Sequence, residues 1–467
     1  MSEAIDDNKM SDTEALMWRL ENDPHLASTF ANVTILDRMP DMDRLRRRME
    51  RAVQRIPRLQ QRVQAAPGNL SPPTWVSDHE FDLNFHIREL ALPEPGTERQ
   101  LFDLATLVTA DPFDRTRPLW QFAIVDGLEG GRAALIQKVH HTISDGEGGV
   151  QLSLEFLDLE RDAPEPISSP DDEHRDNHNQ ANGASEDPDV LTADAVRSLL
   201  AGGLRLPLGI ANRVRELLAD PAQIPTASAS ATETLRDIGS QLSATDKARS
   251  PLWTERSLRR HLDVASAPFA ETRSAARKLG GSLNTAFLTI ASEAASRYHV
   301  ELGAPVESLR ASMAVSTRSE ISGANAFTIV RLLVPTGEIP IDERFRSIQE
   351  AAQAAIGESR AASLETLATV ASTLPSQILT RLARQQTQTV DFATSNVKGS
   401  PVAMYVAGAR LLHNYPAGPL SGVAFNLTLL SYRGNLDMGI NTDAAAVTEP
   451  ELFARSINEA IADFISA

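Results

Sequence analysis

The sequence predicts a mixed α/β protein that folds as two domains. In both halves of the chain, segments with helical periodicity alternate with short apolar segments that are typical of strands. The chain has 467 residues, of which 42% are hydrophobic, and this is enough for two cores because domains usually hold about 100 to 200 residues. Residues 162–189 separate the halves with nine acidic residues, one basic residue and four prolines, a composition typical of a disordered linker.

These features divide the chain into four parts. They are an N-terminal domain at residues 1–160, the acidic linker at 161–190, a helical connector at 191–250 and a C-terminal domain at 251–467. Within the connector, residues 191–219 predict two helical pieces that carry arginines among leucine, valine and isoleucine. Such amphipathic pieces indicate an ordinary helical pair packed on the core or, as the alternative, a contact with a membrane.

The N-terminal domain is predicted to contain helices and a β-hairpin. Apolar side chains at helical spacing predict helices over residues 11–20, 43–63 and 146–157. Two strand-like runs, residues 120–125 and 133–139, are separated by glycines and predict the hairpin. The second strand ends at a pair of histidines, which therefore lie in a turn between a strand and a helix, a common place for catalytic groups.

The C-terminal domain repeats this alternation of helices and strands. Helices are predicted over residues 266–278, 284–298 and 449–466, and strands over residues 309–315, 328–334, 423–431 and 435–441. Mixed helices and strands in both domains predict the same α/β class for each of them.

The turn after the hairpin reads His140-His141-Thr142-Ile143-Ser144-Asp145-Gly146. An alcohol that attacks a thioester must lose its proton, and a histidine titrates close enough to neutrality to accept it. Asp145 can hold the local geometry, and Gly146 permits a close backbone approach. On spacing alone, the motif also fits a surface His–Asp pair or a histidine satisfied inside the core. We expect no metal ion, because the chain has no cysteine and no further ligand at a recognisable spacing.

Further motifs follow one another along nearly the whole chain. They are Phe81-Asp82-Leu83, His86, Leu92-Pro93, Asp111-Pro112-Phe113-Asp114-Arg115-Thr116-Arg117-Pro118-Leu119-Trp120, Leu128-Glu129-Gly130-Gly131-Arg132, Ser316-Thr317-Arg318, Gly323-Ala324-Asn325, Ser395-Asn396-Val397-Lys398-Gly399 and Ser431-Tyr432-Arg433-Gly434. This series resembles the bacterial wax ester synthase/diacylglycerol acyltransferase (WS/DGAT) family of the CoA-dependent acyltransferase superfamily. Two positions depart from the family pattern, Thr285 where an aspartate is frequent and Lys398 where a proline is common. These departures bear on the acceptor substrate more than on the reaction class.

The resemblance implies two chloramphenicol acetyltransferase-like domains with the active site in a tunnel between them. Acyl-CoA and an acceptor alcohol would meet at His141, which the resemblance casts as the general base. His140 would support it, either by orienting the turn or by lining the acceptor site. Asp145 would pair with an arginine, for which Arg318 is the first candidate and Arg310 the second.

The resemblance also points to substrate-binding and supporting residues. The substrate-binding candidates are Gly146, Asn284, Asn396 and Gly399. Asn284 can donate a hydrogen bond to an oxyanion without changing its charge, or it can cap the helix predicted after it. The residues expected to support the fold are Arg318, Pro118, Leu119 and Trp120, of which the last three would pack beside the catalytic strand.

The implied reaction moves a long-chain acyl group from acyl-CoA to the hydroxyl of diacylglycerol, giving triacylglycerol, or of a fatty alcohol, giving a wax ester. Acyl-CoA is then a co-substrate, and we expect no cofactor. The alternatives are a catalytically silent relative that binds lipid or inclusion surfaces, and an acyltransferase for a polyketide, peptide or sugar hydroxyl. The joint presence of His141, Asp145 and Gly146 favours an enzyme over a silent relative.

Composition narrows the partners and the compartment. A net charge of −17 argues against nucleic acid and against broad electrostatic binding to anionic lipid. The absence of cysteine fits a reducing compartment. The polar N-terminus predicts no secretory signal, and no apolar run reaches the roughly 18 to 20 residues that span a bilayer. We therefore expect a cytoplasmic protein, with peripheral contact at the inner membrane face or at lipid inclusions as a further possibility.

Overall fold

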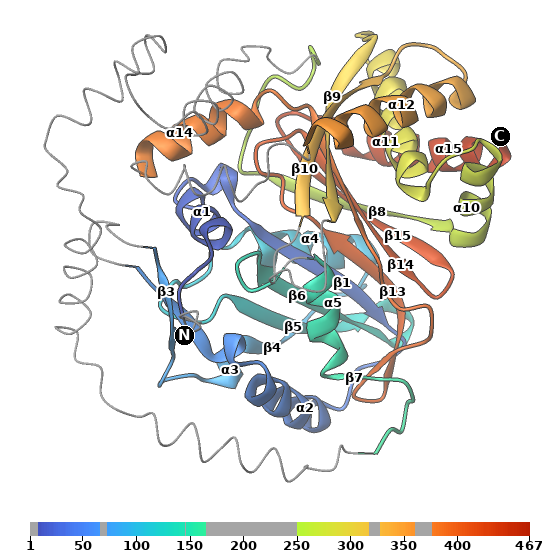
Figure 1. Cartoon of the computed structure of the whole chain (residues 1–467). Helices are drawn as coiled ribbons and strands as arrows, with labels where there is room; N and C mark the ends of the chain where they lie inside the picture. The colour runs from blue at the N-terminus through green and yellow to red at the C-terminus, as the bar shows by residue number, and fades with distance from the viewer. Residues whose placement is uncertain (1–7, 66–71, 145, 165–249, 317–326, 360–375) are drawn as a thin grey trace, which may run out of the picture. The chain divides into compact units, whose positions relative to one another are not determined.

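Two mixed β-sheets carry the fold. The computed structural model describes residues 8–65, 72–144, 146–164, 250–316, 327–359 and 376–467 (Figure 1). Nearly all of them belong to one unit, made of Met1–Val63, Trp75–Arg161 and Thr245–Ala467. A second unit, Gln64–Thr74 with Asp162–Ala244, lies largely outside the described residues, as do most of the predicted linker and helical connector.

The first sheet has seven strands and holds the predicted hairpin. Its order is β4(Ile87–Ala91), β5(Trp120–Leu128), β6(Arg132–His140), β1(Thr29–Leu36), β13(Ala409–Ala417), β12(Tyr405–Val406) and β7(Leu157–Asp158). Strands β5 and β6 pair antiparallel, which confirms the hairpin, and its turn contains Gly130 at φ 78°. Beside this sheet, the short strands β2(Gln61–Gln64) and β3(Thr74–Ser77) form a separate pair.

Helices cover both faces of the first sheet. They are α1(Asp12–Leu20), α2(Met42–Arg55), α3(Leu83–His86), α4(Glu98–Ala110) and α5(Gly146–Leu154), with short 3₁₀ turns η1(Pro24–Leu26), η2(Pro57–Gln60) and η4(Glu129–Gly131). Alternate side chains of β1 enter two different cores, because successive residues of a strand point to opposite faces. The predicted helix over residues 11–20 is confirmed, and Ser11 caps it by accepting a hydrogen bond from the backbone N–H of Glu14.

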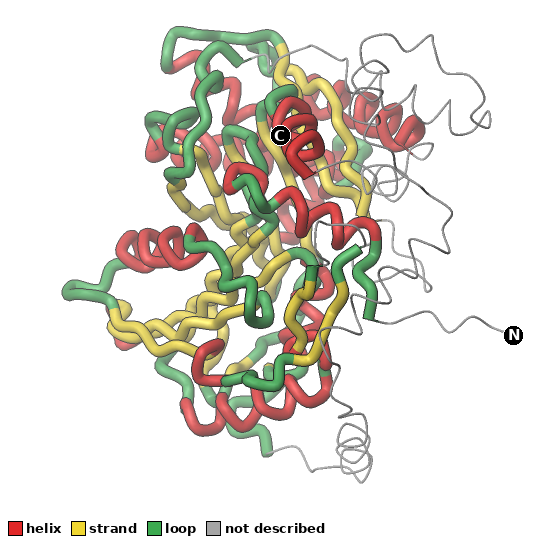
Figure 2. Tube along the Cα trace, turned by 90° about the vertical axis from the view of Figure 1, so that its left-hand side faces the viewer, coloured by secondary structure: helices red, strands yellow, loops and turns green. Residues whose placement is uncertain are grey.

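The second sheet has six strands and lies among the C-terminal helices. Its order is β10(Phe327–Pro335), β9(Ser308–Ser316), β11(Phe392–Val397), β14(Phe425–Tyr432), β15(Asn435–Asp443) and β8(Arg260–Pro268). The helices are α10(Phe269–Lys278), α11(Leu283–Glu301), α12(Ile341–Ser359), α14(Ser376–Thr387) and α15(Pro450–Ser466). Figure 2 shows these helices in red beside the yellow strands, and α11 with α15 closes the largest hydrophobic core. The mixed α/β class is therefore confirmed.

The two sheets share the chain in an interleaved manner. Strand β13 belongs to the C-terminal half of the sequence, but it pairs antiparallel with β1, with Val33 opposite Tyr415. The buried carboxylate of Asp437 on β15 then accepts hydrogen bonds from the backbone N–H of Asn414 and from the Ser266 hydroxyl, both at 2.8 Å. Residues far apart in the sequence therefore complete the first sheet and connect it to the second.

Three helix boundaries differ from the predictions. The helix predicted over residues 146–157 ends at Leu154, because Leu157 pairs with β12 as the start of β7. The helix predicted over residues 43–63 ends at Arg55, because Pro57 lacks an N–H donor and disfavours helical backbone in the residue before it. The helix predicted over residues 266–278 begins only at Phe269, because residues 266–268 pair with β15 as the end of β8. In these segments, apolar residues at helical spacing extend beyond the helix, into backbone that a proline or strand pairing holds in another conformation.

The Pro118-Leu119-Trp120 segment lies at the start of β5. All three side chains are buried. The Trp120 indole N–H donates to the carbonyl of Leu59 at 2.9 Å, and the ring stacks on His86 with 4.5 Å between centroids. His86 Nδ1 lies 2.7 Å from the Trp120 carbonyl and donates to it. Burial lowers the pKa of His86 to about 4, so this histidine is neutral and packs as an aromatic side chain.

Within the described part of the chain, no helix is both long and apolar enough to cross a bilayer.

Candidate active site

His141 lies at the first position after β6. Its backbone N–H donates to the carbonyl of Ser28 at 3.1 Å, which ties the turn to the residue before β1. Its half-buried ring contacts the ring of Phe30, with 4.7 Å between centroids and 48° between planes. The imidazole is therefore positioned by both the end of β6 and the start of β1.

Two cavities meet at His141. We call the first the β1 cavity; it is partly open to solvent and is lined by residues of β1, β6, α5, β13 and β14. We call the second the α14 cavity; it is also partly open to solvent and is lined by residues of α1, β9, β10, α14 and β11. The residues that line both cavities are His141, Ser395, Val397, Pro419 and Asn426. His141 can therefore be approached by two ligands from different sides.

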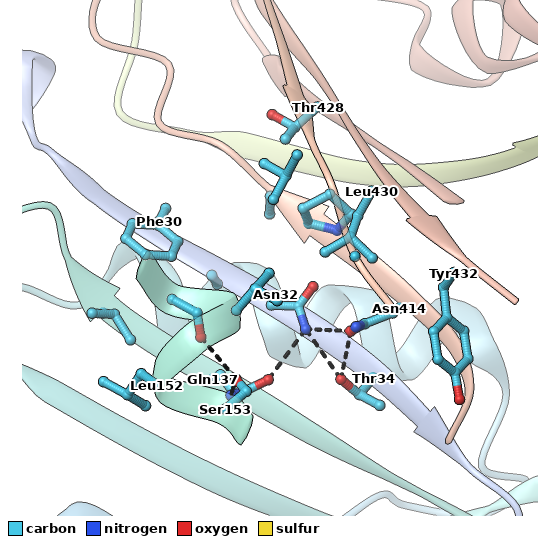
Figure 3. Close-up of a pocket in the computed structure, with 18 of the residues that line it drawn as sticks. Phe30, Asn32, Thr34, Gln137, Leu152, Ser153, Asn414, Thr428, Leu430 and Tyr432 are labelled. Atoms are coloured by element: carbon cyan, nitrogen blue, oxygen red, sulfur yellow. Dashed lines mark hydrogen bonds between the residues drawn. The ribbon is translucent and has the colours of Figure 1, made fainter. Parts of the chain in front are cut away.

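The β1 cavity is mainly apolar. Its wall includes six leucines, three valines, Met404 and Phe30, and Figure 3 shows Phe30, Leu152 and Leu430 around it. An apolar cavity with a few convergent polar groups is typical of a small-molecule site. The lining fits a ligand with a hydrocarbon chain.

His140 does not line either cavity. Its side chain is fully buried, and its Nδ1 accepts a hydrogen bond from the backbone N–H of Thr142 at 3.1 Å. Because Nδ1 accepts this bond, the proton of the neutral ring is on Nε2, which donates to the carboxylate of Glu21. Both ring nitrogens are thereby engaged in hydrogen bonds that hold the turn.

Glu21 is a site residue that the sequence reasoning missed. Burial by itself would raise the pKa of its carboxyl, but the hydrogen bond from His140, together with the charge of Arg115 and the hydrogen bond from Thr29, outweighs it and lowers the pKa. The carboxylate is therefore ionised when it accepts from His140, and it also accepts from the Thr29 hydroxyl at 3.3 Å. A separation of 119 residues between Glu21 and His140 leaves no local signal for this pair.

The predicted pairing of Asp145 with an arginine falls outside the described residues, because neither Asp145 nor Arg318 is described. Arg310, the second candidate partner, is described. Its backbone N–H donates to Asp391 at 2.8 Å and its guanidinium donates to the carbonyl of Thr389 at 3.3 Å. Both contacts join the start of β9 to the residues just before β11.

The remaining substrate-binding candidates occupy different places. Gly146 begins α5, whose later residues line the β1 cavity. Gly399 lines the β1 cavity, and its N–H donates to the Ser431 hydroxyl at 3.2 Å. A Cβ at this position would overlap the Ser431 carbonyl, so the close approach of the two strands requires glycine. Asn396 lines the α14 cavity.

Asn284 lies at the start of α11 and lines a third, smaller cavity. The N-cap of this helix is Ser282, which accepts from the backbone N–H of Thr285 at 3.1 Å, so the predicted capping role of Asn284 is wrong. The Asn284 amide oxygen accepts a hydrogen bond from Asn396. Asn284 therefore reaches the α14 cavity through Asn396 and is absent from the residues that line the two cavities at His141.

The geometry at His141 suits proton transfer between two bound molecules. A histidine at the junction can accept a proton from a hydroxyl in one cavity and return it to a leaving group in the other. Among the residues described, no three histidine or acidic side chains gather in a way that could hold a metal ion.

The fold is that of the CoA-dependent acyltransferases, as two solved structures indicate. The wax ester synthase/diacylglycerol acyltransferase from Marinobacter aquaeolei VT8 matches with a TM-score of 0.66 and 20% sequence identity, covering 98% of each chain. The TRI3 trichothecene 15-O-acetyltransferase from Fusarium sporotrichioides matches with a TM-score of 0.61 and 11% identity, covering 98% of this chain and 94% of that one. At such low identity, these likenesses establish the fold.

The chain belongs to the WS/DGAT family. Residues 10–287 match the wax ester synthase/diacylglycerol acyltransferase catalytic domain, and residues 323–464 match the WS/DGAT C-terminal domain. A putative diacylglycerol O-acyltransferase of Mycobacterium tuberculosis (strain H37Rv) is 32% identical over 472 residues, covering 98% of this chain and 92% of the relative. A probable diacylglycerol O-acyltransferase of the same strain is 26% identical, covering 98% and 96%. The protein is therefore a transferase that moves an acyl group to a hydroxyl, and the resemblance read from the motifs is confirmed.

Proposed function

We propose that this protein transfers a long-chain acyl group from acyl-CoA to the hydroxyl of diacylglycerol or of a fatty alcohol, with His141 as the general base. The observation that carries the proposal is the place of His141, where a mainly apolar cavity meets a second cavity. Family membership and the names of the M. tuberculosis relatives support the same reaction class. Acyl-CoA acts here as a co-substrate, and acyl-CoA and the acyl acceptor are the two partners that the reaction needs.

In the proposed mechanism, the acceptor hydroxyl donates to His141, which takes its proton as the oxygen attacks the thioester carbonyl carbon. The new C–O bond forms, the C–S bond breaks, and the proton returns from His141 to the CoA thiolate. No covalent bond to the protein is required. Glu21 and His140 hold the turn so that the His141 ring keeps its position against Phe30.

The location follows from the acceptor, because diacylglycerols and fatty alcohols reside in membranes and lipid inclusions. We propose a cytoplasmic enzyme that contacts the inner membrane face or an inclusion peripherally. Residues 191–219, for which membrane contact was the alternative to a packed helical pair, lie outside the described residues. Flotation of the purified protein with neutral vesicles that contain diacylglycerol tests this proposal: co-flotation supports it, and protein that stays at the bottom of the gradient contradicts it.

The acceptor and the base are tested together by product analysis. Purified protein is incubated with palmitoyl-CoA and either dipalmitoylglycerol or hexadecanol, and the lipids are separated. We expect triacylglycerol, wax ester or both from the natural protein, and a large loss in His141→Ala. The matched control is His79→Ala, a histidine in an exposed turn. Equal product from the natural protein and His141→Ala would refute the assignment of the base. No product from the natural protein would contradict the proposed function and favour a catalytically silent protein.

A further inference from the structure

One wall of the β1 cavity carries a group of polar side chains that the proposed mechanism does not use. We call it the carboxamide network; it consists of Asn32, Thr34, Gln137, Ser153 and Asn414. The strand register creates it, because Gln137 of β6 lies opposite Asn32 of β1 and Asn414 of β13 lies opposite Thr34. A polar network inside a cavity lined mainly by hydrocarbon requires an explanation, since apolar side chains would pack there at lower cost.

Hydrogen bonds link the members of the carboxamide network to one another (Figure 3), and the Ser153 hydroxyl donates outside it, to the carbonyl of Gly149 at 2.9 Å. The Asn32 amide nitrogen donates toward Thr34 Oγ1 at 3.1 Å, Gln137 Oε1 at 3.2 Å and Asn414 Oδ1. The Thr34 hydroxyl also donates to Asn414 Oδ1, at 2.7 Å, and the Gln137 amide donates to Ser153 Oγ at 3.0 Å. These contacts fix the Asn32 amide with its nitrogen toward the network.

The Asn32 amide oxygen consequently points away from the network. In Figure 3 it turns toward the side of the cavity on which Leu430 lies. It is buried and has no hydrogen-bond donor among the described residues. A buried acceptor without a donor is unfavourable, so this oxygen is a position where a ligand that brings a hydroxyl gains affinity.

The network and His141 line the same cavity. The backbone N–H of His141 donates to Ser28, and its ring contacts Phe30, which lies two residues from Asn32 along β1. Because His141, Phe30 and Asn32 all line the β1 cavity, a ligand that occupies this cavity can contact both the imidazole and the Asn32 amide.

We propose that the β1 cavity accepts a monoacylglycerol, a lipid with two neighbouring free hydroxyls, and that Asn32 selects it over a simple fatty alcohol. This inference rests on the proposed function and adds an acceptor to it. The hydroxyl at His141 loses its proton and bonds to the acyl carbon, the C–S bond of acyl-CoA breaks, and the thiolate takes the proton. The second hydroxyl donates to Asn32 and stays unesterified, so the product is a diacylglycerol.

Two ether lipids test the role of the second hydroxyl without acyl migration. One is the monohexadecyl ether of glycerol with hydroxyls on adjacent carbons, and the other is the monohexadecyl ether of trimethylene glycol, which lacks only the middle hydroxyl. With palmitoyl-CoA, we expect kcat/KM to be about tenfold higher for the glycerol ether, as one neutral hydrogen bond allows. In Asn32→Leu this ratio should fall toward one.

The same substitution at Asn458, an exposed asparagine on α15, is the matched control and should keep the tenfold ratio. If Asn32→Leu does not fold, Asn414→Leu removes a partner that fixes the Asn32 amide and should lower the ratio as well. A ratio near one in the natural protein, or a ratio that survives in Asn32→Leu or in Asn414→Leu, would overturn the inference. If the natural protein acylates neither ether nor any other alcohol, the proposed function itself fails.

Discussion

At the scale of single residues, the two adjacent histidines differ because their rings face different surroundings. His140 is fully buried and bonded through both nitrogens, whereas His141 lines two cavities. The motif could be found in the sequence because its residues are contiguous. Its support by Glu21 could not, because that hydrogen bond depends on how α1 packs against the end of β6.

Glu21 offers a direct test of this positioning. In Glu21→Leu, the Nε2–H of His140 is left buried without its acceptor, so the turn should loosen and kcat should fall on the order of tenfold to a hundredfold, with a smaller change in KM for acyl-CoA. Glu21→Gln keeps an acceptor oxygen and should recover most of the rate. Steady-state kinetics on both variants provides the measurement. Equal losses in both variants would point to a need for the negative charge and not for the hydrogen bond.

At the scale of elements, locally encoded segments were predicted well and long-range pairings were not. The hairpin, α11, α15 and four strands of the second sheet, β9, β10, β14 and β15, follow from periodicity within each segment. Strands β8 and β11 of that sheet were not predicted. Strand β13 could not be assigned to the first sheet, because its partner β1 lies nearly 400 residues earlier in the chain. The carboxamide network depends on this same register, and it was therefore equally hidden from the sequence.

Strand β6 also carries Lys138, which is buried two residues before His140. Its ammonium donates to the carbonyl of Asp111 at 2.6 Å and lies 4.5 Å from the ring centroid of Phe113. Burial lowers the pKa of Lys138 to about 8, below the ordinary value of 10.5. Between these values the unfolded chain binds more protons than the folded one, so the contribution of Lys138 to stability rises as the pH rises.

Comparison with Lys138→Met isolates this effect, because methionine keeps the length and the apolar stem. When the pH rises from 7 to 10, the unfolding free energy of the natural protein should increase relative to that of the variant by about 2 kcal/mol. Urea unfolding at both pH values measures it. A difference that is the same at both values would show that Lys138 is not desolvated in this way.

At the scale of the whole molecule, the sequence predicted two α/β domains with limits at residues 160 and 251, and these limits stay a prediction. The structure adds that β12 and β13 of the C-terminal half complete the sheet of the N-terminal half. It also adds the buried Asp437, which joins β13 to β15. The two halves of the chain are thus held together by a shared sheet.

A cut in the acidic segment tests this interleaving. Cleavage at a protease site introduced within residues 171–182 should leave the two fragments associated, because strand pairing between β1 and β13 does not depend on the continuity of that segment. The fragments should elute together from a sizing column and retain acyl transfer. Separate elution with loss of activity would contradict the account.

The central claim, that His141 takes the proton of the acceptor hydroxyl, is tested most directly by the release of free CoA. The chain contains no cysteine, so a thiol reagent detects only CoA and gives no background from the protein. With palmitoyl-CoA and a saturating acceptor, the account predicts thiol release that requires the acceptor and falls about 10² to 10⁴-fold in His141→Ala. Release at the natural rate from a folded His141→Ala variant would contradict it.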